Sequence, residues 1–234
     1  MFVSILRKVA AVALAIPLLA SAQADLSAEF QDLLEKAKSG DMSAQFFLAN
    51  AFDSGRGVPR NGKEAMRWYK AAAEQGHAES QNSIGSGLQA EKKYSEALIW
   101  YEKAAKQNHA LATNNLAYLY DLGLGVTQDR QRAFSLYSRA ADLGGAEAMW
   151  NIANMYGAGQ LGQPPDLVSA CIWTLRAGKY ATSGERQLLA EVNRVTPMLE
   201  RRLSSTQMSS CRKEAESWSP PQAAARSDQP RNAQ

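Results

Sequence analysis

Histidine and cysteine, two residue types that commonly bind zinc or take part in catalysis, are scarce in this chain of 234 residues. There are two histidines, His77 and His109, and two cysteines, Cys171 and Cys211. These residues form no set with carboxylates at zinc-ligand spacing, and there is no P-loop or dinucleotide-binding fingerprint. The sequence therefore predicts a non-enzyme with no catalytic residue, no metal site and no cofactor.

Charge of one sign is not in excess either. The chain has 26 Lys and Arg against 23 Asp and Glu, a formal net charge of +3. Residues 1–24 hold two basic residues and no acidic one, so the remaining chain carries +1. A nucleic-acid-binding domain usually shows a basic excess or a basic stripe, and we therefore expect no nucleic-acid partner.

Long apolar runs are missing beyond the start of the chain. No later run approaches the length of about 18 residues that a membrane-spanning helix needs, so we expect no stable membrane insertion. At the start, Arg7 and Lys8 precede an apolar stretch at 9–19 and small residues at 22 and 24. This order predicts a signal peptide at residues 1–24 and a periplasmic or secreted protein. A buried N-terminal helix is the alternative.

In an oxidising compartment, a pair of cysteines favours a disulfide, here between Cys171 and Cys211. Closing a loop of this size would stabilise the fold by about 3–4 kcal/mol. Two buried free thiols are the alternative, and the sequence leaves both open.

An internal repeat is the main pattern. WYKAAAEQGHA at 68–78 returns as WYEKAAKQNHA at 100–110, and small and apolar residues recur at helical spacings of three, four and seven. Glycine-rich turns, such as Gly55-Arg-Gly57-Val58, separate two helical halves, and no strand-like alternation is present. A single helix pair cannot bury its apolar face, so neighbouring pairs must stack. The segments of this all-α repeat are 40–75, 76–107, 108–143 and 144–178.

Two segments, LANAFDSGRGVPRNGKEAMRWYKAAAEQGHA at 48–78 and LAYLYDLGLGVTQDRQRAFSLYSRAADLGGA at 116–146, resemble Sel1-like repeats, longer relatives of tetratricopeptide repeats. The resemblance covers about residues 40–178. It implies an α-solenoid of about four helix-turn-helix repeats with N- and C-terminal capping helices.

The segments outside the repeats have separate predictions. Residues 25–39 are expected to form an N-terminal capping helix, and residues 179–218 C-terminal capping helices. Pro197 should kink or break the first of these, and Ser204 should cap the last. Residues 219–234 have little apolar content and are expected to be disordered.

The repeat also accounts for the two histidines, which occupy the same slot at the start of a first helix. A structural role is therefore predicted for both. Ser210 and Lys213 match the S-x-x-K pattern of penicillin-recognising serine enzymes, but the companion S-D-N and K-T-G motifs are absent. A β-lactamase-like hydrolase is the weakest of three functional hypotheses.

First helices line the concave side of a solenoid, and we expect a protein to bind their non-core positions. Aromatic anchors beside amides suit an interface centre. In the alternative interpretation, the aromatic residues pack on neighbouring helices and the amides are only solvated. The predicted surface comprises Phe46, Asn50, Asp53, Asn82, Ser86, Gln89, Asn114, Tyr118, Asp121, Trp150 and Asn154.

The resemblance implies two functions that use such a surface. The first is a periplasmic adaptor or scaffold for an envelope protein or assembly. The second is an immunity protein that neutralises a toxin delivered to the periplasm, for example a phospholipase effector. Both need a protein partner, and neither needs a small-molecule ligand.

Overall fold

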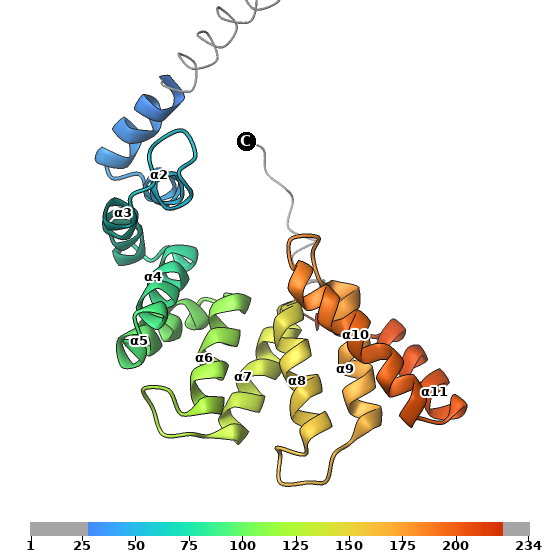
Figure 1. Ribbon diagram of the computed structural model, residues 1–234. Helices are drawn as coiled ribbons and strands as arrows, with labels where there is room; N and C mark the ends of the chain where they lie inside the picture. Colours follow the sequence, from blue (N-terminus) through green and yellow to red (C-terminus); the bar gives the residue numbers. More distant parts are fainter. Residues whose placement is uncertain (1–27, 222–234) are drawn as a thin grey trace, which may run out of the picture. The chain divides into compact units, whose positions relative to one another are not determined.

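The computed structural model describes residues 28–221, and every regular element in that range is a helix (Figure 1). The all-α prediction is confirmed for these residues. The predicted signal peptide and residues 222–234 of the predicted tail lie outside them. The chain divides into two compact units, residues 1–80 and 81–234, which are described separately.

The described part of the first unit holds a helix over residues 28–38, then α2 (Met42–Ser54) and α3 (Gly62–Glu74). Helices α2 and α3 pack against each other. The leading helix contacts α2 through Phe30, whose ring meets Phe52 edge-on with centroids 6.0 Å apart. This helix therefore packs against α2 at this contact. Helix α4 (Ala78–Ala90) begins at the end of this unit.

In the described part of the second unit, α4 is followed by seven helices, each of which starts a few residues after the one before it ends. From α5 to α9 each helix packs on the next one, which is the stacking expected of an α-solenoid. Helices α10 and α11 both pack on α9. The bounds are α5 (Tyr94–Lys106), α6 (Ala110–Leu122), α7 (Arg130–Asp142), α8 (Ala146–Ala158), α9 (Leu167–Tyr180), α10 (Arg186–Arg202) and α11 (Ser205–Ser217).

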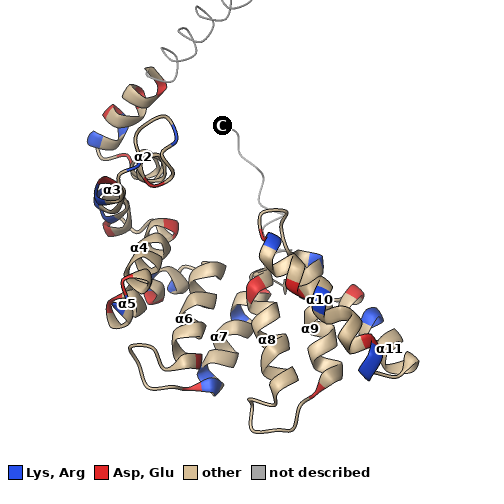
Figure 2. Ribbon diagram, viewed as in Figure 1, with Lys and Arg blue, Asp and Glu red and all other residues tan. Residues whose placement is uncertain are grey.

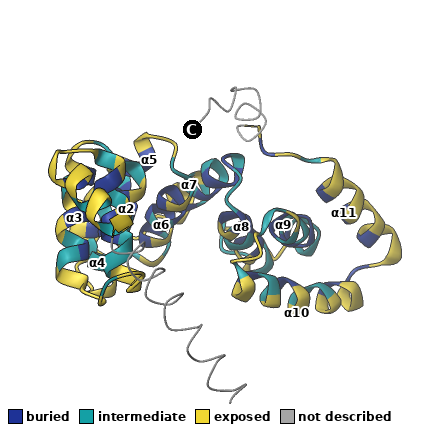
Figure 3. Ribbon diagram, turned by 90° about the horizontal axis from the view of Figure 1, so that it is seen from above, coloured by how far each residue is buried: buried dark blue, intermediate teal, exposed yellow. Residues whose placement is uncertain are grey.

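Small residues at the predicted periodic positions form the helix contacts. Ala97, Ala104, Ala133 and Ala140 are all fully buried, and so are the large rings of Tyr101 and Tyr137. Alanine lets the partner helix approach closely, while the tyrosine fills the space beside it. Figure 3 shows the resulting pattern, with buried sides turned toward neighbouring helices and exposed sides turned away.

Three of the four turns between paired helices have a common construction, and the short turn between α4 and α5 lacks it. A glycine with positive φ ends the first helix, where a side chain would be strained, and an Asn or Asp side chain then caps the second helix. The lengthened turn before α9 keeps both devices. The pairs are Gly55 (φ 74°) with Asn61, Gly123 (φ 69°) with Asp129, and Gly159 (φ 66°) with Asp166.

Helix α10 continues through Pro197, so the proline does not break it, which was one of the two predicted effects. Its apolar side is anchored on both sides of the proline, by buried Val192 before it and buried Leu199 after it. Packing along the whole helix offsets the loss of one backbone hydrogen bond. Ser204 caps α11 as predicted, in a reciprocal capping box with Gln207.

The C-terminal end is fixed to α9 by an aromatic clamp. The guanidinium of Arg176 lies 4.6 Å from the ring centroid of Trp173 and 4.8 Å from that of Trp218. Lys179 Nζ donates a 2.6 Å hydrogen bond to the carbonyl of Glu216. Pro220 is buried, so the packed chain extends past residue 218, where the disordered tail was expected to begin.

Gly85 on α4 generates a test of how closely the two helices of one repeat pack. A Cβ there would lie 2.6 Å from Cε1 of the buried Tyr101 ring. Gly85→Ala should therefore destabilise the protein by about 1–3 kcal/mol in urea unfolding, although alanine favours helix. Gly157→Ala is the matched control. Its Cβ would meet Ala170 at an ordinary 3.7 Å, and it should stabilise by about 0.5–1 kcal/mol. Similar effects of both variants would contradict this packing.

The disulfide between Cys171 and Cys211 is formed, with Cα atoms 6.1 Å apart. It joins α9 to α11 inside a buried cluster that includes Leu199, Leu203 and Met208. A thiol titration of denatured, non-reduced protein should find no free thiol. Reduction should cost about 3–4 kcal/mol of stability through loss of the loop constraint. Two free thiols in that titration would reject the bridge.

Candidate protein-binding surface

Both histidines act as helix N-caps. His109 Nδ1 accepts a 3.1 Å hydrogen bond from the backbone N–H of Ala112, and His77 Nδ1 accepts one of 3.2 Å from Ser80. Asp41 serves the first repeat in the same way. The predicted structural role thus has a physical cause, since the first N–H groups of a helix need an acceptor. Within residues 28–221, no group of three or more His, Cys, Asp or Glu could hold a metal ion.

The S-x-x-K match gains no support from its surroundings. Ser210 and Lys213 are exposed on α11, and the cysteine between them is in the disulfide. Lys213 lines a shallow pocket with Lys179 and Arg212, and Ser210 is not part of its lining. This arrangement does not pair the serine with the lysine in a site.

Several predicted surface residues instead serve the buried tyrosines. Tyr69 Oη donates a 2.6 Å hydrogen bond to Asn50 Oδ1. Tyr101 Oη lies 2.9 Å from Gln89 Oε1 and 3.3 Å from Ser86 Oγ, and burial raises the pKa of this tyrosine. A buried hydroxyl needs a hydrogen-bond partner, so these polar positions have a structural role.

In the third repeat, Asp121 lies at the position that corresponds to Gln89 of the second repeat. Burial of its carboxyl raises the pKa of Asp121, although Arg130 acts in the opposite direction. Burial, together with the negative charge of Asp121, raises the pKa of Tyr137. The acidic residue and the tyrosine therefore lie close enough to influence each other's ionisation.

A ladder of asparagines links successive first helices of the second unit. Asn115 Nδ2 donates to Asn82 Oδ1 at 3.1 Å, and one repeat later Asn151 Nδ2 donates to Asn114 Oδ1 at 2.9 Å. The two acceptors were predicted as surface residues but are buried. The donors were missed, although their register just before a core Leu or Ile repeats in the sequence.

Beside this ladder lies a pocket of about 350 Å³, which we call the amide pocket. Helices α4, α6, α8 and α10 all contribute to it. It contains four of the predicted residues, Gln89, Asn114, Tyr118 and Trp150. The others are Asn115, Glu147, Asn151, Gln187, Leu188 and Glu191. Those from α10 were missed because α10 lies outside the repeat, and no periodicity could place it there.

The charged residues that line the amide pocket are both acidic. Glu191 bonds to Arg194, whose Nε lies 3.0 Å from Oε2. Glu147 receives only a long contact, 3.5 Å, from Asn114 Nδ2. Partial burial raises the pKa of the Glu147 carboxyl, and the nearby charge of Glu185 acts in the same direction.

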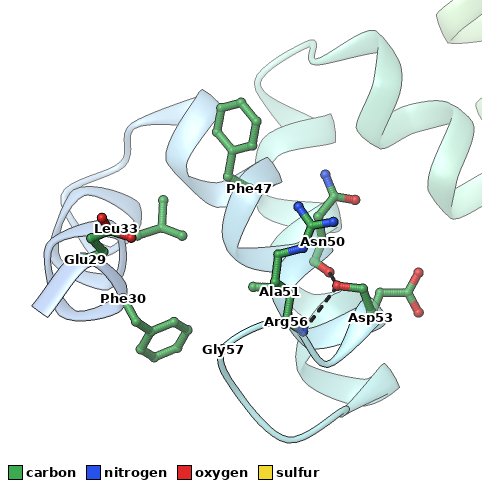
Figure 4. Close-up of a pocket in the computed structure, with 10 residues that line it drawn as sticks. Glu29, Phe30, Leu33, Phe47, Asn50, Ala51, Asp53, Arg56 and Gly57 are labelled. Atoms are coloured by element: carbon green, nitrogen blue, oxygen red, sulfur yellow. Dashed lines mark hydrogen bonds between the residues drawn. The ribbon is translucent and has the colours of Figure 1, made fainter. Parts of the chain in front are cut away.

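In the first unit, the half-buried Phe46 packs against neighbouring rings. Its ring centroid lies 4.6 Å from that of His77 and 6.1 Å from that of Tyr69. The neighbouring Phe47 is 58 % exposed and is the better candidate for an exposed anchor. It lines a pocket of about 550 Å³ with Phe30 and residues of α2 and its following turn (Figure 4).

The remaining predicted residues are exposed and more separate. Asp53 lines the pocket of the first unit, near Arg56 (Figure 4). Asn154 lines a further pocket of about 340 Å³ between α8, α9 and α10, together with Thr174 and the half-exposed Met198. The structure thus gathers four of the eleven predicted residues into the amide pocket and leaves the others elsewhere.

Stacked helix pairs, small-residue contacts and polar first helices define a helical-repeat protein of the class that serves as protein-interaction modules. Residues 43–77, 81–109, 110–145 and 146–179, more than half of the chain, match the Sel1 repeat model. The chain belongs to the Sel1 repeat family. Interaction modules of this family are generally not enzymes.

Two solved structures illustrate the likeness. One is a protective antigen with an SLR fold, present in uropathogenic Escherichia coli strains, which is 27 % identical in sequence with a TM-score of 0.71. The match covers 88 % of this chain and 44 % of the antigen chain. This chain thus spans less than half the length of that protein. A Sel1 repeat protein from Oxalobacter formigenes is 34 % identical, with a TM-score of 0.60, over 68 % of this chain and 67 % of its own. No curated protein matches the chain.

The cap at His109 can be tested by substitution. His109→Ala removes the acceptor for the Ala112 N–H and should cost about 1 kcal/mol of stability. His109→Asp keeps an acceptor, as Asp41 shows in the first repeat, and should lose much less. The measurement is urea unfolding at neutral pH. An equal loss in both variants would show that the imidazole ring itself matters, and not its acceptor.

Proposed function

We propose that the protein is an adaptor or scaffold that binds a protein partner in the periplasm through the first helices of its second unit. The amide pocket carries the proposal. It places an exposed tyrosine and a half-buried tryptophan beside five amide side chains, which suits recognition of a polypeptide segment. The amides can donate to and accept from a peptide backbone.

Two features support export. Residues 1–24 have the order of a signal peptide. The Cys171–Cys211 disulfide is typical of an oxidising compartment.

None of the helices within residues 28–221 is long and apolar enough to span a bilayer. Figure 2 shows acidic and basic residues interspersed along the helices, without the long basic stretch that a nucleic-acid surface needs.

Affinity capture tests the proposal. Oxidised protein, residues 25–234, should retain a specific envelope protein from a periplasmic extract, identified by mass spectrometry. Tyr118→Ala and Trp150→Ala should reduce the captured amount at least tenfold without altering the circular dichroism spectrum. Ile99→Ala is the control, because it removes an exposed apolar side chain from a second helix, away from the pocket.

Three outcomes separate the alternatives. Capture that survives both pocket variants would contradict binding at this surface. A captured toxin whose activity the protein blocks would assign the immunity role in place of the adaptor role. Absence of any partner, combined with turnover of a substrate by purified protein, would reject an interaction module.

A further inference from the structure

The amide pocket has an unbalanced charge. Among the described residues, its charged lining consists of two glutamates, and no lysine or arginine lines it. Arg194 already neutralises Glu191. Glu147, in contrast, forms no ion pair within the described residues, and a second carboxylate, Glu185, lies close enough to raise its pKa. The pocket therefore presents one carboxylate without a counter-charge.

The tryptophans give an independent observation. The chain has five, and four of them have a cationic side chain over the ring. Trp68 has Arg67, Trp100 has Lys103, and Trp173 and Trp218 share Arg176. Trp150, in the amide pocket, has no such cation from the part of the chain that the structure describes.

We propose that the amide pocket binds an arginine side chain from an exposed segment of the partner, with its guanidinium on the Trp150 ring and paired with the Glu147 carboxylate. This inference rests on the proposed function and names the chemistry of the partner. A guanidinium is planar, so it can stack on an indole and still donate two hydrogen bonds to a carboxylate. Arg176, whose guanidinium lies over the rings of Trp173 and Trp218, is the intramolecular counterpart within this protein.

The surrounding amides suit a side chain attached to a polypeptide. Asn151 donates a hydrogen bond to Asn114, which fixes the orientation of these two lining residues. Gln187 and Gln89 also line the pocket, and their amides can donate to and accept from the backbone of the segment that carries the arginine. A hard metal ion fits less well, because Ca²⁺ and Mg²⁺ need several oxygen ligands and Glu147 is a single available carboxylate.

The test uses three blocked pentapeptides that differ only in the central residue: acetyl-Gly-Ser-Arg-Ser-Gly-amide, its citrulline analogue and its glutamine analogue. Citrulline keeps the shape of arginine but carries no charge. Titration into oxidised protein, residues 25–234, is followed by the ¹H–¹⁵N signal of the Trp150 indole. The arginine peptide should shift this signal with at least tenfold higher affinity than either neutral peptide.

Glu147→Gln should lower the affinity for the arginine peptide at least tenfold, because it removes the charge and keeps the size. Glu216→Gln, on α11 and outside the amide pocket, is the matched control and should change nothing. Raising the salt concentration should weaken binding, as expected for an ion pair. Circular dichroism verifies that each variant is folded.

Equal affinities for the arginine and citrulline peptides would overturn the inference. An unchanged affinity of Glu147→Gln for the arginine peptide would also overturn it. So would the absence of a shift in the Trp150 signal up to about 10 mM peptide, a concentration above the dissociation constants of ordinary recognition. These results leave the proposed function standing if a captured partner still depends on Tyr118 and Trp150. The proposed function fails separately if capture yields no such partner.

Discussion

The hydroxyl groups of the buried Tyr69 and Tyr101 make the interaction on which the geometry of the first two repeats depends. Tyr69 and Tyr101 fill the space between paired helices, and each reaches a polar side chain on the first helix of its own repeat. A ring in this place without an acceptor would leave a polar atom desolvated, at a cost of about 1–3 kcal/mol. The first helices therefore carry polar residues for internal reasons, and a polar residue at a repeating position is not by itself evidence of a binding surface.

This constraint explains which predictions from the sequence succeed. Helix pairing, glycine turns and small-residue contacts depend on local periodicity, and the structure confirms them. The surface prediction used the same periodicity to select the positions that do not repeat. Periodicity alone does not reveal that Asn50 and Gln89 form hydrogen bonds with the hydroxyl groups of Tyr69 and Tyr101. Nor does it reveal that Phe46 packs on His77, because the ring contact depends on side-chain direction.

The C-terminal helices mark the other limit of the repeat pattern. Their amphipathic spacing and the cap at Ser204 are local, and were predictable. The approach of α10 to the first helices is not local, because it depends on how Leu199, the disulfide and the Arg176 clamp hold α10 and α11 against α9. Three of the ten residues that line the amide pocket, Gln187, Leu188 and Glu191, belong to α10.

The fourth repeat shows how departure from the pattern creates space. Thr174 occupies the position that a tyrosine fills in the first three repeats, and a pocket of about 340 Å³ opens beside it. Trp150 and Glu147 belong to the same repeat, where the N-cap position is a glycine without a capping side chain. Stacking requires complementary side chains where neighbouring repeats contact each other. The last repeat, however, packs on α10, which is not part of a repeat. Its side chains are therefore the least constrained by the repeat, and this is where a solenoid can place residues chosen for a partner.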